Sequence, residues 1–462
     1  MSLSTTNRNN KTKTHNHIMY YRFITTIALA LATIGASAQT IDEPMLLSLD
    51  ECVRIALSDN PTIRINEMEI QRVQYSKKEI QGQLLPTINF TGQYNRTLAK
   101  QTMTMNAGDE PMTIKVGMDN QHSVGFNASM PLVMPTLWKS IKLSDNQILQ
   151  NIENARANKL SLVNQVKNAY YALLLAQDSK NVIEENHATA QLNASIYQKQ
   201  FELGTASEYD VLRANVAVTN LEPSILEAEN YVDLLKLQLK VLMGMDVRTP
   251  IAPRQTLDEF KAKMYDQSIL ADTSLVSNTS LRSLELKTDY LKRALDTQKM
   301  SWYPTLTASA NYMWNSMSNG SPFKNFNWNP YSTVGLTLSL PLFQGGQRYY
   351  KQRQAEVALR EMSWQRENLE RSLKMQVQSQ VDIINKTLKQ ISSNEGGVRQ
   401  ATKANDIVQQ SFKIGAASFI QLRDTEDALM NARLSYYQAI YNYLVAECDL
   451  EYLLGNTHYV AK

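Results

Sequence analysis

Four short stretches of the chain alternate between apolar and polar residues, which is the pattern of a β-strand with one apolar face. The alternation predicts strands at 87–96, 121–132, 304–315 and 331–343. Each has about the ten residues that a tilted strand needs to cross a bilayer, so the apolar faces fit lipid. Residues of the last two strands that we expect to face lipid are Leu306, Tyr312, Leu336, Leu338 and Leu340.

A soluble β-sandwich with one wet face would also contain alternating strands. However, the sequence predicts only these four strands, and a soluble sandwich needs more. The apolar runs also have aromatic neighbours, which are enriched where a membrane protein meets the interface. We therefore favour membrane-spanning strands. The aromatic residues in question are Tyr94, Tyr312, Trp314, Trp328 and Tyr331.

Most of the remaining chain has the pattern of long helices. No proline lies between Pro135 and Pro223, and none follows Pro341. The segments 137–203 and 346–413 would each be about 100 Å long at 1.5 Å per residue, too long for one compact domain. Apolar residues recur at steps of three and four, as in a coiled-coil seam, so we expect these helices to pack together as a bundle or cylinder.

Two glycines mark the expected ends of these helices. Gly204 and Gly415 each follow an apolar residue, and a serine three residues later, Ser207 or Ser418, is placed to cap a returning helix. Each long helix is therefore expected to form a hairpin with the helix that follows it. Pro223 lies in the first returning helix and predicts a kink there, whereas its counterpart in the second is Leu434.

The chain repeats one plan twice. Residues 58–94 match 277–312 at an offset of about 218, and SVGFNASMPLV at 123–133 matches TVGLTLSLPLF at 333–343. The hairpin turns match as well, because FELGTAS contains Gly204 and FKIGAAS contains Gly415. A period of this kind is the signature of a duplicated structural unit. We divide the chain into a first repeat at 39–244, an equatorial connector at 245–276, a second repeat at 277–457 and a tail at 458–462.

Residues 1–38 resemble a secretory signal peptide. Positive charges precede a short apolar run at 23–34, and Ala36-Ser37-Ala38 is a small-residue cleavage signature. We expect cleavage after Ala38, with Met19 as an alternative start of the protein. An uncleaved anchor is the other interpretation, but the apolar run is shorter than the roughly 20 residues that a spanning helix needs.

Composition and motifs narrow the chemistry. A formal net charge of +3 on 462 residues favours no nucleic-acid partner. The two cysteines, Cys52 and Cys448, lie near opposite ends of the mature chain, and we favour two buried thiols over a disulfide. No metalloprotease, P-loop, nucleophile-elbow or Cys-x-x-Cys motif occurs, so we predict no enzyme, cofactor or metal.

Four membrane strands cannot close a barrel alone, because barrels start at about eight strands. An open sheet edge in lipid leaves unsatisfied backbone groups that cost several kcal/mol each. Further copies must therefore complete the barrel. Because eight strands are filled by side chains and larger barrels leave a lumen, three or more copies are favoured.

The sequence resembles the TolC-type outer-membrane efflux proteins over about residues 45–457. The resemblance rests on the repeated N-P…LLP and Y-P-T-L segments, on SLPLFQGGQ at 339–347 and on the twin G-[TA]-A-S turns. It implies a mainly α protein in which a long helical coiled-coil barrel joins four strands per protomer of a trimeric twelve-stranded β-barrel. It also implies an outer-membrane location extending into the periplasm, and an inner-membrane pump that docks through a periplasmic adaptor.

The same resemblance assigns roles to the hairpin tips. The turns would dock the adaptor, through Gly204, Thr205, Ala206 and Ser207 and through Gly415, Ala416, Ala417 and Ser418. Family members also close the tip with an acidic ring, whose matching positions are Gln421 and Asp424, so one carboxylate of the ring is replaced here. Asp210 is a third candidate for this periplasmic gate, and Asp210, Arg213 and Arg423 are candidates for ion pairs that hold the tip.

Gly396-Gly397 offers a further expectation. Two adjacent glycines cost a helix about 2 kcal/mol relative to alanine. We expect them to interrupt the helix and create a bend that lets the hairpin move.

These patterns together predict the passive outer-membrane exit duct of a tripartite efflux or type I secretion system. A non-transporting coiled-coil scaffold is the alternative, although a scaffold does not need strands of bilayer length. A hydrolase on a helical frame is a weaker alternative, since no nucleophile–base pattern is present.

Overall fold

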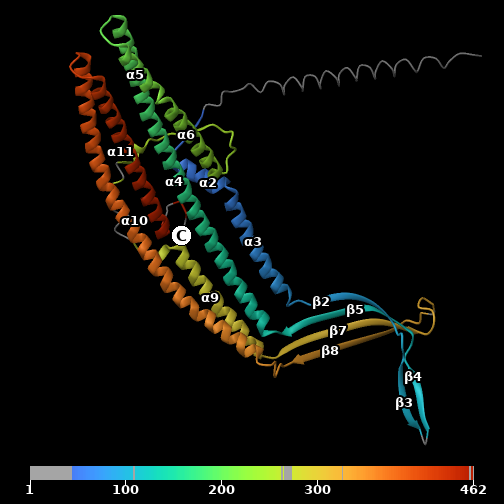
Figure 1. Cartoon of the computed structure of the whole chain (residues 1–462). Helices are drawn as coiled ribbons and strands as arrows, with labels where there is room; N and C mark the ends of the chain where they lie inside the picture. The colour runs from blue at the N-terminus through green and yellow to red at the C-terminus, as the bar shows by residue number, and fades with distance from the viewer. Residues whose placement is uncertain are drawn as a thin grey trace, which may run out of the picture.

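The structure is a computed structural model that describes residues 44–107, 110–261, 264, 273–324, 326–456 and 459–460. The expected signal peptide at 1–38 lies outside these residues. Figure 1 shows a long, curved body of helices, with a sheet that leaves one end of the body at an angle. The two hairpin tips lie at the opposite end of the body.

The helical body is built on two very long helices. α4 (Pro135–Glu202) has 68 residues and α10 (Gln347–Lys413) has 67, so both span about 100 Å as expected. α4 packs against α3, α6, α9 and α11, whereas α10 packs against α9 and α11. The other helices are α2 (Leu49–Asp59), α3 (Pro61–Gly82), α5 (Glu208–Thr219), α6 (Glu222–Met243), α7 (Leu257–Phe260), η2 (Leu275–Ser277), α9 (Thr279–Lys299), η3 (Met300–Trp302) and α11 (Phe419–Leu454).

The main core lies in the middle of the body, where α2, α4, α6 and α11 meet. Tyr170 is fully buried there, and its hydroxyl donates a hydrogen bond to the carbonyl oxygen of Leu47. Cys52 and Cys448 are buried free thiols in the same cluster, which confirms the preference for unpaired cysteines. Burial raises the pKa of Cys52 to about 12, so its thiol is protonated and inert.

The connector between the halves has more structure than its sequence suggested. β6 (Ile251–Pro253) pairs in parallel with β1 (Met45–Leu47), and α7 follows it. The buried carboxylate of Asp178 on α4 accepts a hydrogen bond from the backbone nitrogen of Leu257. Farther along, Lys261 forms an ion pair of 2.9 Å with Glu395 on α10. These contacts attach the connector to the side of the helical body.

The sheet contains four antiparallel strands in the order β2-β5-β7-β8. Their bounds are β2 (Thr87–Arg96), β5 (Asn120–Val133), β7 (Thr305–Ser318) and β8 (Asn329–Ser339). β2 covers the residues expected for the first strand, and β5 and β7 start within one residue of expectation. The expected end of the last strand at 343 is wrong, so Leu340 lies beyond β8. Pro341 explains this end, because proline has no backbone N–H to donate to a ladder.

Two further strands were missed, in addition to β1 and β6. β3 (Gln101–Ala107) and β4 (Glu110–Val116) form an antiparallel hairpin that projects from the far end of the sheet (Figure 1). The expectation of only four alternating strands was therefore wrong. Each of these strands has seven residues, which is too short for the bilayer-length pattern that identified the others.

The two expected helix irregularities have opposite outcomes. α10 runs without interruption through Gly396 and Gly397, so the expected break is wrong; i→i−4 hydrogen bonds on both sides hold the glycines in the helix. By contrast, the first returning helix is divided at Asn220–Leu221 into α5 and α6, with Pro223 in the first turn of α6. The second returning helix, α11, is continuous. The expected inequality of the two hairpins is confirmed.

Candidate functional site: the hairpin tips and the strand sheet

Both hairpin turns use the same backbone device. Gly204 and Gly415 adopt φ angles of 74° and 76°, in the left-handed region that favours glycine. The following backbone nitrogens, of Thr205 and Ala416, each donate a hydrogen bond of 2.8 Å to a carbonyl one turn back. An L-residue at either glycine would be strained, which explains the two matching glycines without any partner.

A serine capping box starts each returning helix. Ser207 pairs with Asp210, and Ser418 pairs with Gln421, through reciprocal backbone and side-chain hydrogen bonds. The side-chain oxygen of Gln421 accepts from the backbone nitrogen of Ser418 at 2.9 Å. Asp210 and Gln421, two of the three expected gate residues, thus have a structural task at the tip.

The third expected gate residue, Asp424, is exposed one turn further along α11. The ion pairs expected to hold the tip take another form. Arg423 pairs with Asp427 of its own helix at 3.0 Å. The guanidinium of Arg213 lies over the ring of Phe419, 5.7 Å from its centroid, and so links the two hairpins through a cation–π contact.

The two tips pack on each other around one aromatic residue. The ring of Tyr197 on α4 lies 5.6 Å from that of Phe412 and 5.2 Å from that of Phe419, on either side of the second turn. Beyond this cluster, Leu203 and Ile414 project at the turns with exposed fractions of 78% and 82%. Exposed leucine and isoleucine beside small turn residues form a surface that a partner can cover.

Sequence reasoning missed a buried carboxylate below the tip. Glu426 on α11 is 6% exposed and accepts a hydrogen bond of 2.9 Å from the side chain of Asn193 on α4. Burial is the main cause that raises the pKa of Glu426 above its usual value. A signal was available, because Leu422, Glu426 and Leu429 follow the four- and three-residue steps of an apolar seam.

The register of the sheet gathers most of its large apolar side chains on one face. Phe126 lies opposite Phe90 on one side and Tyr312 on the other, and Leu306 lies opposite Leu338. These residues share one face, because side chains alternate along each strand. The other face carries pairs such as Asn127 with Asn311 and Ser309 with Gly335.

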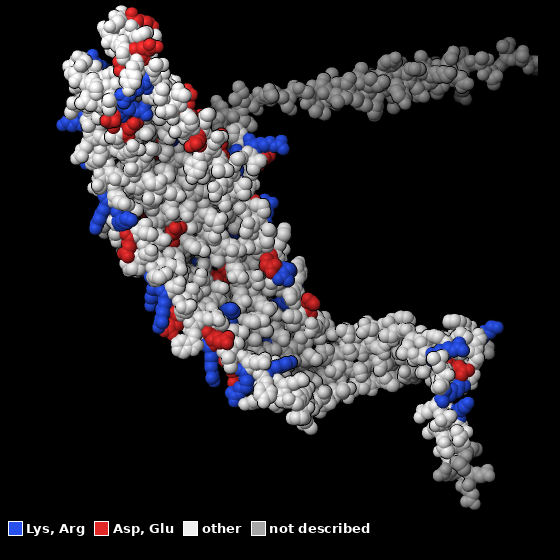
Figure 2. Space-filling model, in the orientation of Figure 1, with Lys and Arg blue, Asp and Glu red and all other residues white. Residues whose placement is uncertain are grey.

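The apolar face is uncovered. Leu336 and Leu338 are both 69% exposed, while Tyr312 is 45% exposed and Leu306 is half-buried. Arg96, at the outer end, is the only charged residue in the four strands. Figure 2 shows the result as an uncharged zone between charged helices and a charged outer end. Such a continuous exposed apolar zone requires lipid or protein to cover it.

Aromatic side chains lie at both limits of this zone. At the outer end, the ring of His122 stacks on Tyr94 with centroids 4.7 Å apart and meets the edge of Phe326 at 5.0 Å. At the inner end, the guanidinium of Arg348 lies 4.6 Å from the ring centroid of Trp302. Aromatic belts at two levels are typical of membrane–water interfaces.

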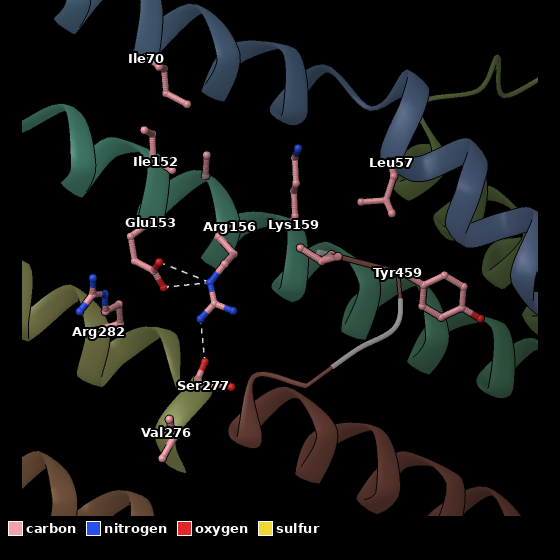
Figure 3. Close-up of a pocket in the computed structure, with 12 residues that line it drawn as sticks. Leu57, Ile70, Ile152, Glu153, Arg156, Lys159, Val276, Ser277, Arg282 and Tyr459 are labelled. Carbon is pink, nitrogen blue, oxygen red and sulfur yellow. Dashed lines mark hydrogen bonds and ion pairs between the residues drawn. The ribbon is translucent and has the colours of Figure 1, made fainter. Parts of the chain in front are cut away.

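A cavity of about 680 Å³ lies in the helical body, between α2, α3, α4 and the start of α9. Figure 3 shows Arg156 between Glu153 and the carbonyl of Ser277, with hydrogen bonds of 3.1 and 2.7 Å. Ile152 is exposed at this cavity. Arg156 thus contacts both halves of the chain, and the cavity lies where the two halves meet.

The described residues contain no group of three or more His, Cys, Asp or Glu side chains placed to hold a metal ion. Within the same part of the chain, no helix combines the length and the hydropathy required to cross a bilayer. The exposed sheet and the paired tips are therefore the surfaces that need a functional explanation.

Comparison with known proteins supplies a functional explanation for these surfaces. The outer membrane efflux protein family matches the chain twice, over residues 52–245 and 270–456. The chain belongs to this family. An outer-membrane location that extends into the periplasm and a role as a channel follow from that membership, and the family consists of channel proteins, not enzymes.

Two relatives and one solved structure illustrate the likeness. The chain is 24% identical over 376 residues to outer membrane protein TolC of Vibrio cholerae, covering 80% of this chain and 82% of that protein. It is 23% identical over 421 residues to the alkaline protease secretion protein AprF of Pseudomonas aeruginosa, covering 90% and 85%. Among solved structures, VceC from Vibrio cholerae superposes with a TM-score of 0.69 at 15% identity, covering 88% and 96% of the two chains. That structural likeness shows a shared fold.

Proposed function

We propose that this protein is the passive exit duct of a tripartite efflux or type I secretion system, built as a ring of identical copies. The observation that supports this most directly is the open four-stranded sheet. Its apolar face is exposed and its polar face lies opposite, and it is joined to helices about 100 Å long that can cross the periplasm. A sheet with one lipid-compatible face and one wet face suits the wall of a pore.

The unpaired edges of the sheet support a ring. β2 and β8 each lack a second neighbour, and open edges in lipid cost several kcal/mol per backbone group. Matching the two halves of the chain makes β7 the counterpart of β2 and β5 the counterpart of β8. Because β5 pairs with β7 inside one copy, β8 of one copy is expected to pair with β2 of the next. Three copies would give a closed barrel of twelve strands.

This correspondence also predicts a register between copies. Asn127 lies opposite Asn311 within the sheet. Shifting the first by the 210-residue offset that aligns 123–133 with 333–343, and the second back by 218, places Thr337 opposite Gln93 of the next copy. Both residues lie on the polar face, so their side chains would face the water-filled interior.

The helices support the same closure. α9 packs against both α4 and α10, whereas its counterpart α3 packs against α4 and leaves its outer flank open. That flank exposes Ile65, Met68 and Tyr75 at 62–66%. α10 correspondingly exposes Trp364 at 72% and Met375 at 65%. In a ring, α10 of one copy would cover α3 of the next, as it covers α9 within its own copy.

The tips are the surface for a periplasmic adaptor, through which an inner-membrane pump would connect. Leu203 and Ile414 supply apolar contact, while the small residues at 205–206 and 416–417 allow close approach of partner helices. Asp424 is the expected gate carboxylate that no capping box engages, and around a ring it would concentrate cations in a narrow throat. Relatives named for protease secretion and for antibiotic efflux make both small molecules and polypeptides candidate cargo.

Single-channel conductance in planar bilayers tests this function. We expect small, cation-selective currents from the purified wild type, and larger currents from Asp424→Ala, because the throat loses its ring of charge. Glu208→Gln, at an exposed site on the other hairpin, is the matched control and should leave the currents unchanged. A folded, membrane-inserted protein that never conducts would contradict the duct and favour a scaffold.

A further inference from the structure

The two hairpins of one copy meet along α4 and α11, and a buried polar pair joins them below the tip. Asn193 on α4 and Glu426 on α11 are 7% and 6% exposed. The side-chain nitrogen Nδ2 of Asn193 donates to Oε1 of Glu426 at 2.9 Å. Each residue belongs to a different hairpin, so any separation of the hairpins breaks this bond.

The cations near Glu426 are already paired with other acids. On its own helix, Arg423 pairs with Asp427 at 3.0 Å. Beside it lies a cavity of about 240 Å³ to which the three packed helices contribute charged groups: Glu185 from α4, Asp406 from α10 and Arg433 from α11. Arg433 pairs with Glu185 at 2.5 Å. Among the described residues, therefore, no ion pair forms on Glu426, and its buried carboxylate depends on the amide of Asn193.

We propose that Glu426 and Asn193 form a proton-dependent latch between the two hairpins, which holds while Glu426 is protonated and releases when it ionises. A protonated carboxyl suits the site, since it can donate to the oxygen of the Asn193 amide and accept from its nitrogen. An ionised carboxylate is costly to bury without a cation, and separating the hairpins returns it to water.

The direction of the pH dependence follows from linkage. Burial is the largest cause and raises the pKa of Glu426 in the packed arrangement above its value in water, against smaller lowering effects of the Asn193 hydrogen bond and of Arg423. The packed arrangement therefore binds the proton more tightly, so it is favoured at low pH and loses that advantage as pH rises through the raised pKa. Each unit by which the pKa differs between the two arrangements changes their equilibrium about tenfold. The consequence for passage through the tip rests on the proposed duct, but the latch does not.

Spin labels on the two hairpins measure the latch directly. Cysteines introduced at Gln191→Cys and Ala428→Cys lie on exposed positions of α4 and α11, while the native Cys52 and Cys448 are buried and shielded from label. Distances between the labels would be measured on the full-length oligomer from about pH 4 to pH 8. A conductance series over the same range separates the latch from the duct, because the hairpins can move in a protein that does not conduct.

We expect the label distance to increase with pH in the otherwise wild-type protein and to stay short throughout in Glu426→Gln, whose neutral amide keeps the bond. Glu208→Gln, which removes an exposed carboxylate at the tip, should follow the wild type. Asn193→Asp places two carboxyl groups together and should move the transition to higher pH. A wild-type distance that does not change with pH, or equal profiles for the wild type and Glu426→Gln, would overturn the latch.

Discussion

The helical body and the strand sheet bury their apolar side chains in opposite directions. In the body, Val166 and Tyr170 are fully buried between helices. In the sheet, every residue of the edge strands β2 and β8 is exposed, including Phe90 and Leu336. The same residue types thus face inward in one region and outward in the other. This contrast fits the proposed duct, in which water surrounds the helices and lipid surrounds the sheet.

This contrast gives the two regions different sources of stability. The body has a continuous core within one copy, so it gains free energy from burial on its own. The sheet has hydrogen bonds between its strands but little buried area, and its edges are open. In the proposed ring, lipid and neighbouring copies would supply much of the sheet's stability. Substitutions in the body and in the sheet should therefore have different effects on stability.

The largest effect is expected in the core of the body. Leu173→Ala removes a side chain that is 1% exposed and should cost about 2–5 kcal/mol in the free energy of unfolding. Leu336→Ala, in the sheet, removes a similar side chain that is 69% exposed and should cost much less in detergent. Thermal unfolding of the purified variants measures both. Equal losses would show that the sheet is packed as tightly as the body.

Charge on the two faces of the sheet should have unequal effects. Leu338→Arg puts a cation on the apolar face and should cost about 2–4 kcal/mol near the bilayer midplane. Thr337→Arg, on the adjacent residue of the polar face, should be tolerated. Folding into lipid vesicles during urea titration measures the difference. A tolerated Leu338→Arg together with a damaging Thr337→Arg would reverse the assignment of the faces.

The glycine pair in α10 should accept alanine. No neighbouring atom lies within 4 Å of a Cβ built at Gly397, and at Gly396 only the Arg399 side chain is reached, at 4.0 Å. Gly396→Ala with Gly397→Ala should therefore stabilise the helix by up to about 2 kcal/mol, because alanine is the better helix former. A higher melting temperature with unchanged conductance would show that the two glycines are not a hinge. Lost conductance in a more stable protein would restore that role.

Loss of a helix cap is expected to have the smallest effect. Ser418→Ala removes the hydroxyl that accepts from the backbone of Gln421 and should cost about 1 kcal/mol. Ser418→Asp keeps a capping oxygen and serves as the control. Hydrogen exchange of the first turn of α11 localises the change. If both variants exchange alike, the capping box does not determine the stability of this tip.

Local chemistry explains which expectations succeeded. Strand β2 and the long helices were predictable, because alternation over a bilayer length and long stretches without proline are strong local signals. The serine caps and the break before Pro223 follow from the same kind of rule. The uninterrupted α10 could not be predicted by such a rule. The helical hydrogen bonds on either side of Gly396 outweigh the low helix propensity of the two glycines. The hairpin of β3 and β4 was missed because seven residues carry too little periodicity.

The tip shows where sequence reasoning reached its limit. The turn glycines were identifiable, but the capping roles of Asp210 and Gln421 depend on rotamers that a sequence does not reveal. Glu426 was missed because glutamate is rarely fully buried, so the residue type gives no sign of burial. Only the packing of α11 on α4 shows that it points into the interface between the hairpins.

Disulfide trapping between copies tests the central claim, that identical copies complete the sheet. Thr337→Cys with Gln93→Cys should form an intermolecular disulfide, since opposite residues of paired strands lie within the Cα separation that a disulfide spans. Oxidation should then convert the protein to a covalent trimer. Thr337→Cys with Thr91→Cys, which moves the second cysteine two residues along β2, should cross-link weakly. A protein that remains monomeric after oxidation, or that cross-links equally in both registers, would contradict closure of the barrel by β8 and β2 of neighbouring copies.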